Sequence, residues 1–297
     1  MGLRRFIIVT TASLLGMLTL AVWFYPSNDD FRIENPFWNG YEALAENFPV
    51  RPLSSLANLP SPAGEVTVME IPSVAFTAGE VGRLKGFVEG GGKLVLADDY
   101  GHGNQVLESF GLAVRFTGQV MLDPVINYKN GQFPRIIHFR SGPLTDNITE
   151  IVFNHATSLE GVTGEEALAY SSSFSFLDTN DDGESQDDEP RGPLPVISVH
   201  PMGSGQVVLI ADASLFLNSM MFEDNTKLLR NIVAGQEAIY IDQSHLPSSE
   251  LVRTKGWIRR ASDFLSRPAG TTAAVGIVLA AALAPLWRKD KETRSIE

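Results

Sequence analysis

The chain has 297 residues, of which 44% are hydrophobic and 20% are charged, and this composition excludes a disordered or low-complexity protein. Lys and Arg number 23 against 35 Asp and Glu, a net charge of −12, which excludes nucleic acid as a partner because its phosphates would be repelled. Cysteine is absent, so disulfides, thiolate catalysis and cysteine-ligated metals are excluded as well.

The first hydrophobic segment comprises residues 6–25, which carry no charge and follow Arg4 and Arg5. A helix of this length is about 30 Å long and matches the hydrocarbon core of a bilayer. A signal peptide would need small residues before its cleavage site, and residues 21–26 (AVWFYP) lack that pattern. We therefore expect residues 1–26 to form an uncleaved transmembrane anchor.

The second hydrophobic segment comprises residues 269–287, and the basic residues Arg288 and Lys289 follow it. Its place near the chain end and this basic stop favour a second transmembrane helix over a buried core helix. The tail, residues 288–297, is then cytoplasmic. Two segments predict a two-pass protein of the plasma membrane, with both termini on the same side. Arg4 and Arg5 before the first segment, and Asp29 and Asp30 after it, predict that the termini are inside and the main domain is outside.

Residues 247–268 mix apolar residues with five basic ones. This pattern is typical of a basic amphipathic juxtamembrane helix that lies on membrane lipid, and a plain linker helix is the alternative. These basic residues stand on the side that the charge rule places outside. The preceding domain is strongly acidic, however, and large acidic domains are translocated despite a few such charges.

The middle of the chain, residues 27–246, alternates apolar strands with amphipathic helices. In chain order, we expect a helix at 38–48, a strand at 65–71, a helix at 78–89 with a capping box at its start, a strand at 93–98, a helix at 104–110, strands at 135–139, 148–153, 196–200 and 206–211, a helix at 225–234 and a strand at 238–242. This order predicts one extracytoplasmic α/β domain with a parallel or mixed sheet flanked by helices.

The stretch FVEGGGKLVLADDYGHGN, residues 87–104, resembles class I glutamine-amidotransferase-like domains. In those domains a strand runs into a Gly-Ile-Cys-x-Gly-His turn that bears the nucleophile. When Gly101 and His102 are aligned with this turn, Asp99 stands where the cysteine would be. Glutaminase chemistry is therefore not expected, since it requires a thiolate.

Two further stretches, GPLPV at residues 192–196 and ADASLFLN at residues 211–218, restrict the resemblance to one family with this fold. Over residues 28–245 the chain is similar to the family called domain of unknown function four-three-five-zero. The resemblance implies membrane anchoring and an amidotransferase-like fold with flavodoxin-like layering. It also implies MoxR-type ATPase and transglutaminase-like neighbours, but no activity.

The loop that follows the strand at 93–98 holds four candidate ligand-binding residues: Asp98, Asp99, His102 and Asn104. Ligands of open α/β sheets bind at the carboxyl ends of strands. Asp99 and His102 could also act as the acid–base pair of a hydrolase. The alternative is ordinary turn chemistry, in which Asp99 or Asn104 caps the next helix.

Asp212 and Asn218 are two further ligand-binding candidates, because Asp212 ends another apolar strand. If the sheet brings Asp212 beside Asp99, the two would form an acidic pocket for a cation or a polar ligand. Otherwise Asp212 caps a turn. Residues 242–245 (DQSH), after the last strand, are a weaker candidate and are interpreted as a loop.

Residues 178–189 (DTNDDGESQDDE) match the twelve-residue calcium loop, Asp-x-Asn-x-Asp-Gly followed by Glu. The predicted ligands of this calcium ion, the one cofactor that the sequence suggests, are Asp178, Asn180, Asp182, Glu184 (through its carbonyl) and Glu189. Because residues 170–176 alternate like a strand and prolines follow the loop, an EF-hand pair is excluded. A single weak calcium loop and a solvated acidic loop remain as alternatives.

Together these features predict a membrane-anchored extracytoplasmic binding or scaffolding protein with a non-catalytic domain. Its expected partners are membrane lipid and other membrane or cell-surface proteins. Two other functions stay open: a cell-surface hydrolase centred on Asp99 and His102, and an accessory subunit of a membrane transport complex.

Overall fold

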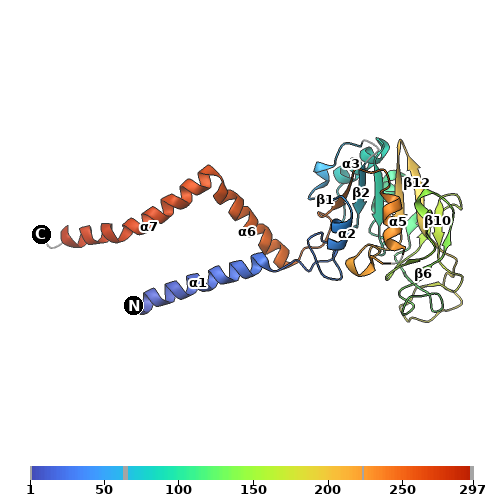
Figure 1. Cartoon of the computed structure of the whole chain (residues 1–297), viewed down its shortest axis with the longest axis horizontal. Coiled ribbons are helices and arrows are strands. Elements are labelled where there is room, and N and C mark those ends of the chain that lie inside the picture. Colours follow the sequence, from blue (N-terminus) through green and yellow to red (C-terminus); the bar gives the residue numbers. More distant parts are fainter. Residues whose placement is uncertain (1, 63–65, 223, 295–297) are drawn as a thin grey trace. The chain divides into compact units, whose positions relative to one another are not determined.

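The computed structural model describes residues 2–62, 66–222 and 224–294 (Figure 1). Glu65, where the sequence predicts the second element to begin, and residues 295–297 of the tail lie outside the described residues. The chain divides into two compact units. One unit is Pro26–Pro247, and the other combines Met1–Tyr25 with Ser248–Glu297.

The unit Pro26–Pro247 is built on an eight-stranded sheet with the order β1-β14-β2-β3-β13-β12-β10-β7. These strands are β1 (Val50–Leu53), β2 (Val66–Glu70), β3 (Lys93–Ala97), β7 (His138–Phe139), β10 (Ala167–Tyr170), β12 (Pro195–Met202), β13 (Gly205–Ile210) and β14 (Ala238–Asp242). The strands from β1 to β13 in this order run parallel, and β12, β10 and β7 extend the sheet antiparallel. The expected mixed α/β sheet is thus confirmed.

The central strands are apolar on both faces because both faces are covered. In β3, Leu94, Val95 and Leu96 are all fully buried, although successive side chains of a strand point to opposite faces. Such continuous apolar runs are typical of parallel strands packed between two layers. The buried hydrophobic core lies entirely between Tyr41 and Leu246, within the unit Pro26–Pro247.

Within the described residues of this unit, four α-helices and three 3-10 turns accompany the sheet. They are α2 (Glu42–Asn47), α3 (Ala78–Glu89), α4 (Asn104–Phe110), α5 (Asn225–Ile232), η1 (Leu56–Asn58), η2 (Pro143–Thr145) and η3 (Asn218–Met220). The capping box of α3 forms as predicted: Glu80 N donates to Thr77 Oγ1 at 3.3 Å, and Thr77 N donates to the Glu80 carboxylate at 2.8 Å. Helix α3 packs on β3 and β13.

Three small antiparallel pairs complete the β-structure: β4 (Arg115–Phe116) with β9 (Leu159–Glu160), β5 (Val120–Leu122) with β11 (Phe176–Asp178), and β6 (Arg135–Ile136) with β8 (Ile151–Val152). All lie in the segment between α4 and β12. This segment is β-rich, as the sequence indicates, but its strands are short.

Several predicted elements are wrong in extent. The helix expected at 38–48 is shorter in the structure, where it is α2. Residues 38–41 form turns instead, and the carbonyl groups of residues 38 and 40 accept hydrogen bonds from the N–H groups of residues 219 and 218. The strand expected at 135–139 divides into β6 and β7, which join different sheets. The strand-like pattern of 170–176 is interrupted by a serine turn at 171–175. Strand β1 was missed, since its Pro52 is unusual in a strand.

The second unit contains α1 (Leu3–Phe24), α6 (Glu250–Ser266) and α7 (Pro268–Arg294). Of the helices that the structure describes, α1 alone is long and apolar enough by itself to cross a membrane, and none of its side chains is buried. Helix α6 and the part of α7 up to Ala281 meet at 89° and satisfy the same criteria only as one bent pair. A helix like α1 serves as a membrane anchor or as a signal sequence.

Candidate functional site at the carboxyl edge of the sheet

The carboxyl ends of β3 and β13 lie side by side in the sheet. Ala97 pairs with Ile210, and Asp98 N donates to Ile210 O at 3.1 Å. Asp99 and Asp212 each follow this pair by two residues, so they lie at equivalent positions just beyond the ends of the two neighbouring strands. Burial, and then the charge of Asp99, raise the pKa of Asp212 well above its usual value, which agrees with this proximity.

Asp98 builds the turn between β3 and α4. Its side chain is buried, with Oδ1 accepting hydrogen bonds from Tyr100 N at 2.9 Å and Gly101 N at 3.2 Å, and Oδ2 from Gly103 N at 2.5 Å. Gly101 adopts a φ of +83°, which other residues rarely tolerate. Burial raises the pKa of Asp98, while these N–H groups hold the rise down. Neither Asp99 nor Asn104 caps α4 as the alternative interpretation of the sequence had it: the N-cap residue is Gly103, α4 has no side-chain cap among the described residues, and Asp98 holds the turn before it.

Asp99 is the candidate carboxylate that lines a cavity. Burial raises the pKa of Asp99 to about 7, with a further contribution from the negative charge of Asp98 beside it. A carboxyl group with this pKa is protonated in mild acid and charged in mild base. It can therefore donate a hydrogen bond to a ligand at one pH and attract a cation at another.

The cavity beside Asp99 has a volume of about 750 Å³, within the range of about 300–1,000 Å³ that is usual for small-molecule sites. Its apolar lining consists of Phe31, Trp38, Tyr100, Tyr128, Phe133, Leu217, Met220 and Phe222. Its polar lining consists of Asp30, Asn39, Asp99, Lys129, Asn154, His155, Ser214 and Ser219. Trp38 and Tyr100 are 68% and 74% exposed, so two aromatic rings are open to a ligand.

His102 makes other contacts. Its Nδ1 lies 3.1 Å from Pro72 O, and its ring stacks on Tyr100 with 5.9 Å between the ring centroids. The charge of His102 has only a minor lowering effect on the pKa of Asp99. The structure thus places His102 against Pro72 at the start of the loop that follows β2.

The other three candidates bind backbone groups. Asn104 donates to Phe116 O and accepts from Phe116 N, each at 2.9 Å. Asp212 accepts from the backbone N–H groups of residues 154 and 214, each at 2.7 Å. Asn218 accepts from the N–H of residue 43 at 2.8 Å and donates to the carbonyls of residues 35 and 37. Asp212 and Asn218 thus fix loops that line the cavity, whereas Asn104 ties the start of α4 to β4.

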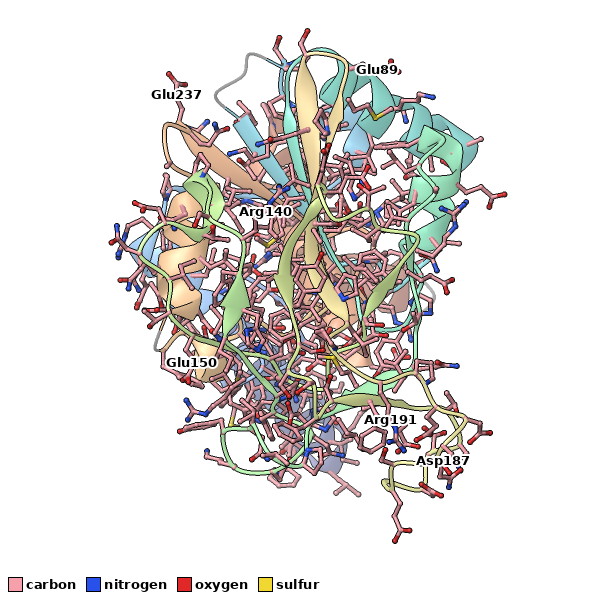
Figure 2. All side chains as sticks on the ribbon, turned by 90° about the vertical axis from the view of Figure 1, so that its right-hand side faces the viewer. Glu89, Arg140, Glu150, Asp187, Arg191 and Glu237 are labelled. Atoms are coloured by element: carbon pink, nitrogen blue, oxygen red, sulfur yellow. The ribbon has the colours of Figure 1, made fainter. Side chains whose placement is uncertain are left out.

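The predicted calcium loop has the backbone turn that its sequence requires. Asp178 accepts from Asp182 N at 3.1 Å and from Gly183 N at 2.8 Å, and Gly183 has a φ of +77°. Glu189 binds back to Thr179 N at 2.8 Å. Figure 2 shows Asp187 of this loop at the periphery of the domain. Asn180, Asp182 and Glu184 are exposed, and calcium binding here stays a prediction.

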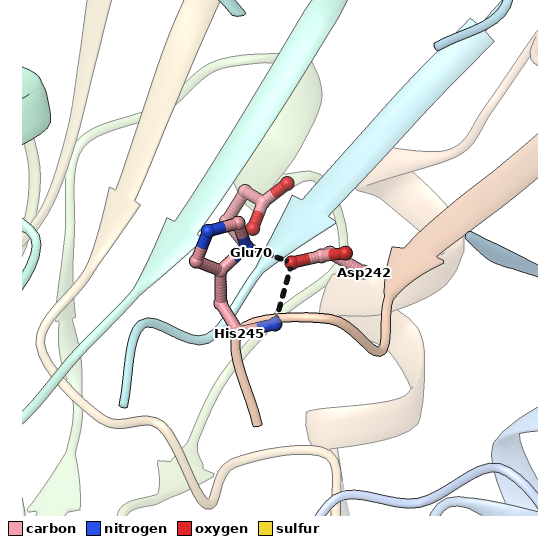
Figure 3. A group of neighbouring side chains, drawn as sticks. All are labelled: Glu70, Asp242 and His245. Carbon is pink, nitrogen blue, oxygen red and sulfur yellow. Dashed lines mark hydrogen bonds and ion pairs between the residues drawn. The ribbon is translucent and has the colours of Figure 1, made fainter. Parts of the chain in front are cut away.

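A second cluster on this edge of the sheet, Glu70 with Asp242 and His245, was not predicted as a site from the sequence (Figure 3). The sequence indicated Glu70 only as part of a strand, and residues 242–245 as a weaker candidate interpreted as a loop. Burial and the neighbouring Asp242 carboxylate raise the pKa of Glu70 well above its usual value. Burial raises the pKa of Asp242, but hydrogen bonds from His245 and Ser244 outweigh it and lower this pKa. Burial lowers the pKa of His245, but the hydrogen bond to Asp242 and the charge of Asp242 outweigh it and raise this pKa. One signal was available, namely an acidic residue at the end of the apolar run VTVME.

The fold and the cavity define the class of protein: an α/β domain with a mixed sheet and a small-molecule-sized cavity near its carboxyl edge. The family described as "Domain of unknown function (DUF4350)" matches residues 33–233. The chain therefore belongs to this family, as the resemblance in the sequence suggested. No curated protein matches the chain.

Solved structures resemble the chain only distantly. The mmIFT52 N-terminal domain has 14% sequence identity and a TM-score of 0.46, with 63% of this chain and 84% of that one covered. A β-galactosidase from Bacillus circulans sp. alkalophilus has 14% identity and a TM-score of 0.37, with 57% of this chain and 22% of the enzyme covered. A putative ThuA-like protein from Bacteroides uniformis has 13% identity and a TM-score of 0.30, with coverage of 58% and 71%.

Proposed function

We propose that the chain is a membrane-anchored extracytoplasmic binding or scaffolding protein, whose non-catalytic α/β domain holds a small polar ligand in the cavity beside Asp99. In this proposal α1 and residues 269–287 both cross the plasma membrane, the termini are cytoplasmic, and the domain has amidotransferase-like layering. Helix α6 lies on membrane lipid, and other membrane or cell-surface proteins, including MoxR-type ATPase or transglutaminase-like neighbours, are its partners.

The cavity is the observation that carries this proposal. It combines exposed aromatic rings, Trp38 and Tyr100, with amide, hydroxyl and carboxyl groups that can orient a polar molecule. Aromatic faces supply contact area, and a few polar groups supply specificity. The position near the carboxyl ends of parallel strands is where open α/β sheets bind ligands.

Binding is favoured over hydrolysis by what the candidate residues contact. Four of the candidates form side-chain hydrogen bonds with backbone groups, namely Asp98, Asn104, Asp212 and Asn218. The ring of His102 contacts Pro72 O. Of these six candidates Asp99 alone lines the cavity, so the proposed acid–base partner His102 does not accompany it there.

Anchoring is favoured by charge and exposure together. Helix α1 is apolar and has no buried side chain, so its surface needs an apolar environment. Between residues 27 and 268 the chain has 17 Lys and Arg against 32 Asp and Glu, a balance of −15. A domain of this size is translocated largely regardless of its charge, whereas Arg4 and Arg5 in the first turn of α1 favour the cytoplasmic side.

Single-cysteine labelling tests this location, because the natural chain offers no thiol. In Tyr100→Cys the thiol stands at the cavity, and in Thr293→Cys it stands in the tail. We expect a membrane-impermeant maleimide added to intact spheroplasts to modify Tyr100→Cys and to leave Thr293→Cys unmodified until the membrane is permeabilised.

The matched control is Leu96→Cys, whose fully buried position should stay unmodified in the folded protein in both cases. Labelling of Thr293→Cys in intact spheroplasts, with Tyr100→Cys protected until permeabilisation, would reverse the topology and remove the proposed location.

A further inference from the structure

The cluster of Glu70, Asp242 and His245 is formed where two parallel strands end. Met69 of β2 pairs with Ile241 of β14, so Glu70 and Asp242, one residue further on, end neighbouring strands at the same level. His245 follows in the turn after β14, and its carbonyl accepts a hydrogen bond from Ser73 N at 3.1 Å. Figure 3 shows the three side chains converging beyond the strand ends.

The three side chains offer ligand atoms at the spacing of a metal site. One oxygen of Glu70, one oxygen of Asp242 and one imidazole nitrogen of His245 all lie within 4.8 Å of one another. The exposed fractions are 0%, 1% and 5%, so water does not screen these charges. Among the described residues this is the one group of three such side chains so close together.

The Glu70 carboxyl group indicates a ligand, because it is buried and has no hydrogen-bond donor among the described residues. It is fully buried, and neither of its oxygens receives a hydrogen bond from an N–H or hydroxyl group of the described residues. Asp242, by contrast, accepts from Ser244 N at 3.0 Å, Ser244 Oγ at 2.6 Å and His245 N at 3.1 Å. A buried carboxyl group without a donor costs several kcal/mol unless a proton or a cation satisfies it.

The imidazole of His245 is held in place from three sides. Its Nδ1 lies 2.5 Å from Asp242 Oδ2, its Nε2 lies 3.7 Å from Glu80 Oε2, and its ring stacks on Phe76 with 4.1 Å between the ring centroids. A carboxylate behind the second ring nitrogen is the arrangement that orients metal-binding histidines. Glu80 is itself fixed by the capping box of α3.

We propose that Glu70, Asp242 and His245 bind one divalent transition-metal ion of the zinc class. The ion displaces the proton between Asp242 and His245 Nδ1, and these two atoms, 2.5 Å apart, must separate to bind it because Zn–N and Zn–O bonds are each about 2.0–2.2 Å long. The same ion satisfies the buried Glu70 carboxylate. One imidazole with two carboxylates suits zinc better than calcium or magnesium, which prefer oxygen ligands alone. Its role is to tie β2 and β14 to the turn through which the chain leaves the domain.

Zinc binding by the full-length protein in detergent tests this proposal. After treatment with chelator and dialysis against zinc, we expect one zinc per chain by elemental analysis. The melting temperature should rise by several degrees over that of the chelator-treated protein, because zinc binds only the folded state. Calcium and magnesium at the same concentration should give a smaller rise.

Glu70→Gln is the decisive variant, because glutamine has the size of a protonated glutamate and keeps the packing. It should lower zinc affinity at least about tenfold, and Glu80→Gln should weaken it less, through the orientation of His245. The control Glu237→Gln changes an exposed residue, labelled in Figure 2, and should bind zinc like the parent. Less than stoichiometric zinc, or full zinc binding by Glu70→Gln, would overturn the proposal. Without metal, Glu70→Gln should melt at an unchanged or higher temperature than the parent, because the variant removes a buried carboxyl group that has no donor within the described part of the chain.

Discussion

Asp98→Ala is expected to lower the free energy of unfolding of the domain by about 3–5 kcal/mol, the largest effect of any substitution at the candidate site. The variant leaves three backbone N–H groups, those of Tyr100, Gly101 and Gly103, without their acceptor. The bond from Gly103 N is buried and those from Tyr100 N and Gly101 N are part-buried. A buried N–H group that loses its partner costs about 1–3 kcal/mol, and rearrangement of the turn or entry of water recovers part of that cost at the part-buried groups. The turn that carries Asp99 should loosen with it.

Urea unfolding of residues 26–247 measures this effect, because the whole buried core lies in that unit. Asp98→Asn, which retains one acceptor oxygen, should cost roughly half as much. Asp187→Ala, in the exposed acidic loop, serves as the matched control and should change stability by less than about 0.5 kcal/mol. A loss below about 1 kcal/mol for Asp98→Ala would show that the turn does not depend on this carboxylate.

Asp99→Asn is expected to act in the opposite direction and only at higher pH. In the unfolded chain Asp99 loses its proton near its ordinary pKa of 3.8, whereas the folded domain holds the proton up to about pH 7. The folded state thus binds more protons between these values, and the stability of the parent falls as the pH rises through this window. Asparagine does not ionise, so the variant escapes this loss.

The stability of Asp99→Asn relative to the parent should therefore grow by about 1–3 kcal/mol between pH 5 and pH 8. The measurement is urea unfolding of both proteins at the two pH values. Glu237→Gln again provides the control, since its difference from the parent should not depend on pH over this range. A constant difference between Asp99→Asn and the parent would mean that the Asp99 carboxyl titrates with an ordinary pKa.

Local signals predicted the elements that depend on local interactions. The helices at 78–89 and 225–234 and the strand at 238–242 appear in the structure at or within two residues of their expected limits. In the first of these, the Thr77–Glu80 capping box and the apolar periodicity are both readable along the chain. Short strands such as β8, and the turn at residues 38–41, depend on partners elsewhere in the sequence, so their limits were not predictable.

The position of the candidate site was predictable from the sequence, but the separate roles of its residues were not. A strand that ends in two aspartates indicated the carboxyl edge of the sheet. Nothing in the sequence shows that Asp98 accepts three backbone hydrogen bonds while Asp99 lines a cavity, because this difference depends on burial. Glu70, Asp242 and His245 come together only because β2 and β14 are neighbours, and strand order cannot be derived from local patterns.

Ligand occupancy of the Asp99 cavity is tested most directly by nuclear magnetic resonance of residues 26–247, in which Trp38 is the only tryptophan. The probes are N-acetylglucosamine, a neutral saccharide, and benzylamine, an aromatic cation. We expect saturable shifts of the Trp38 indole resonance, with benzylamine binding about threefold tighter at pH 8 than at pH 6 because Asp99 becomes charged. Asp99→Asn should remove this pH dependence. Shifts confined to other residues, with the Trp38 resonance unmoved by either probe, would contradict the cavity as the binding site.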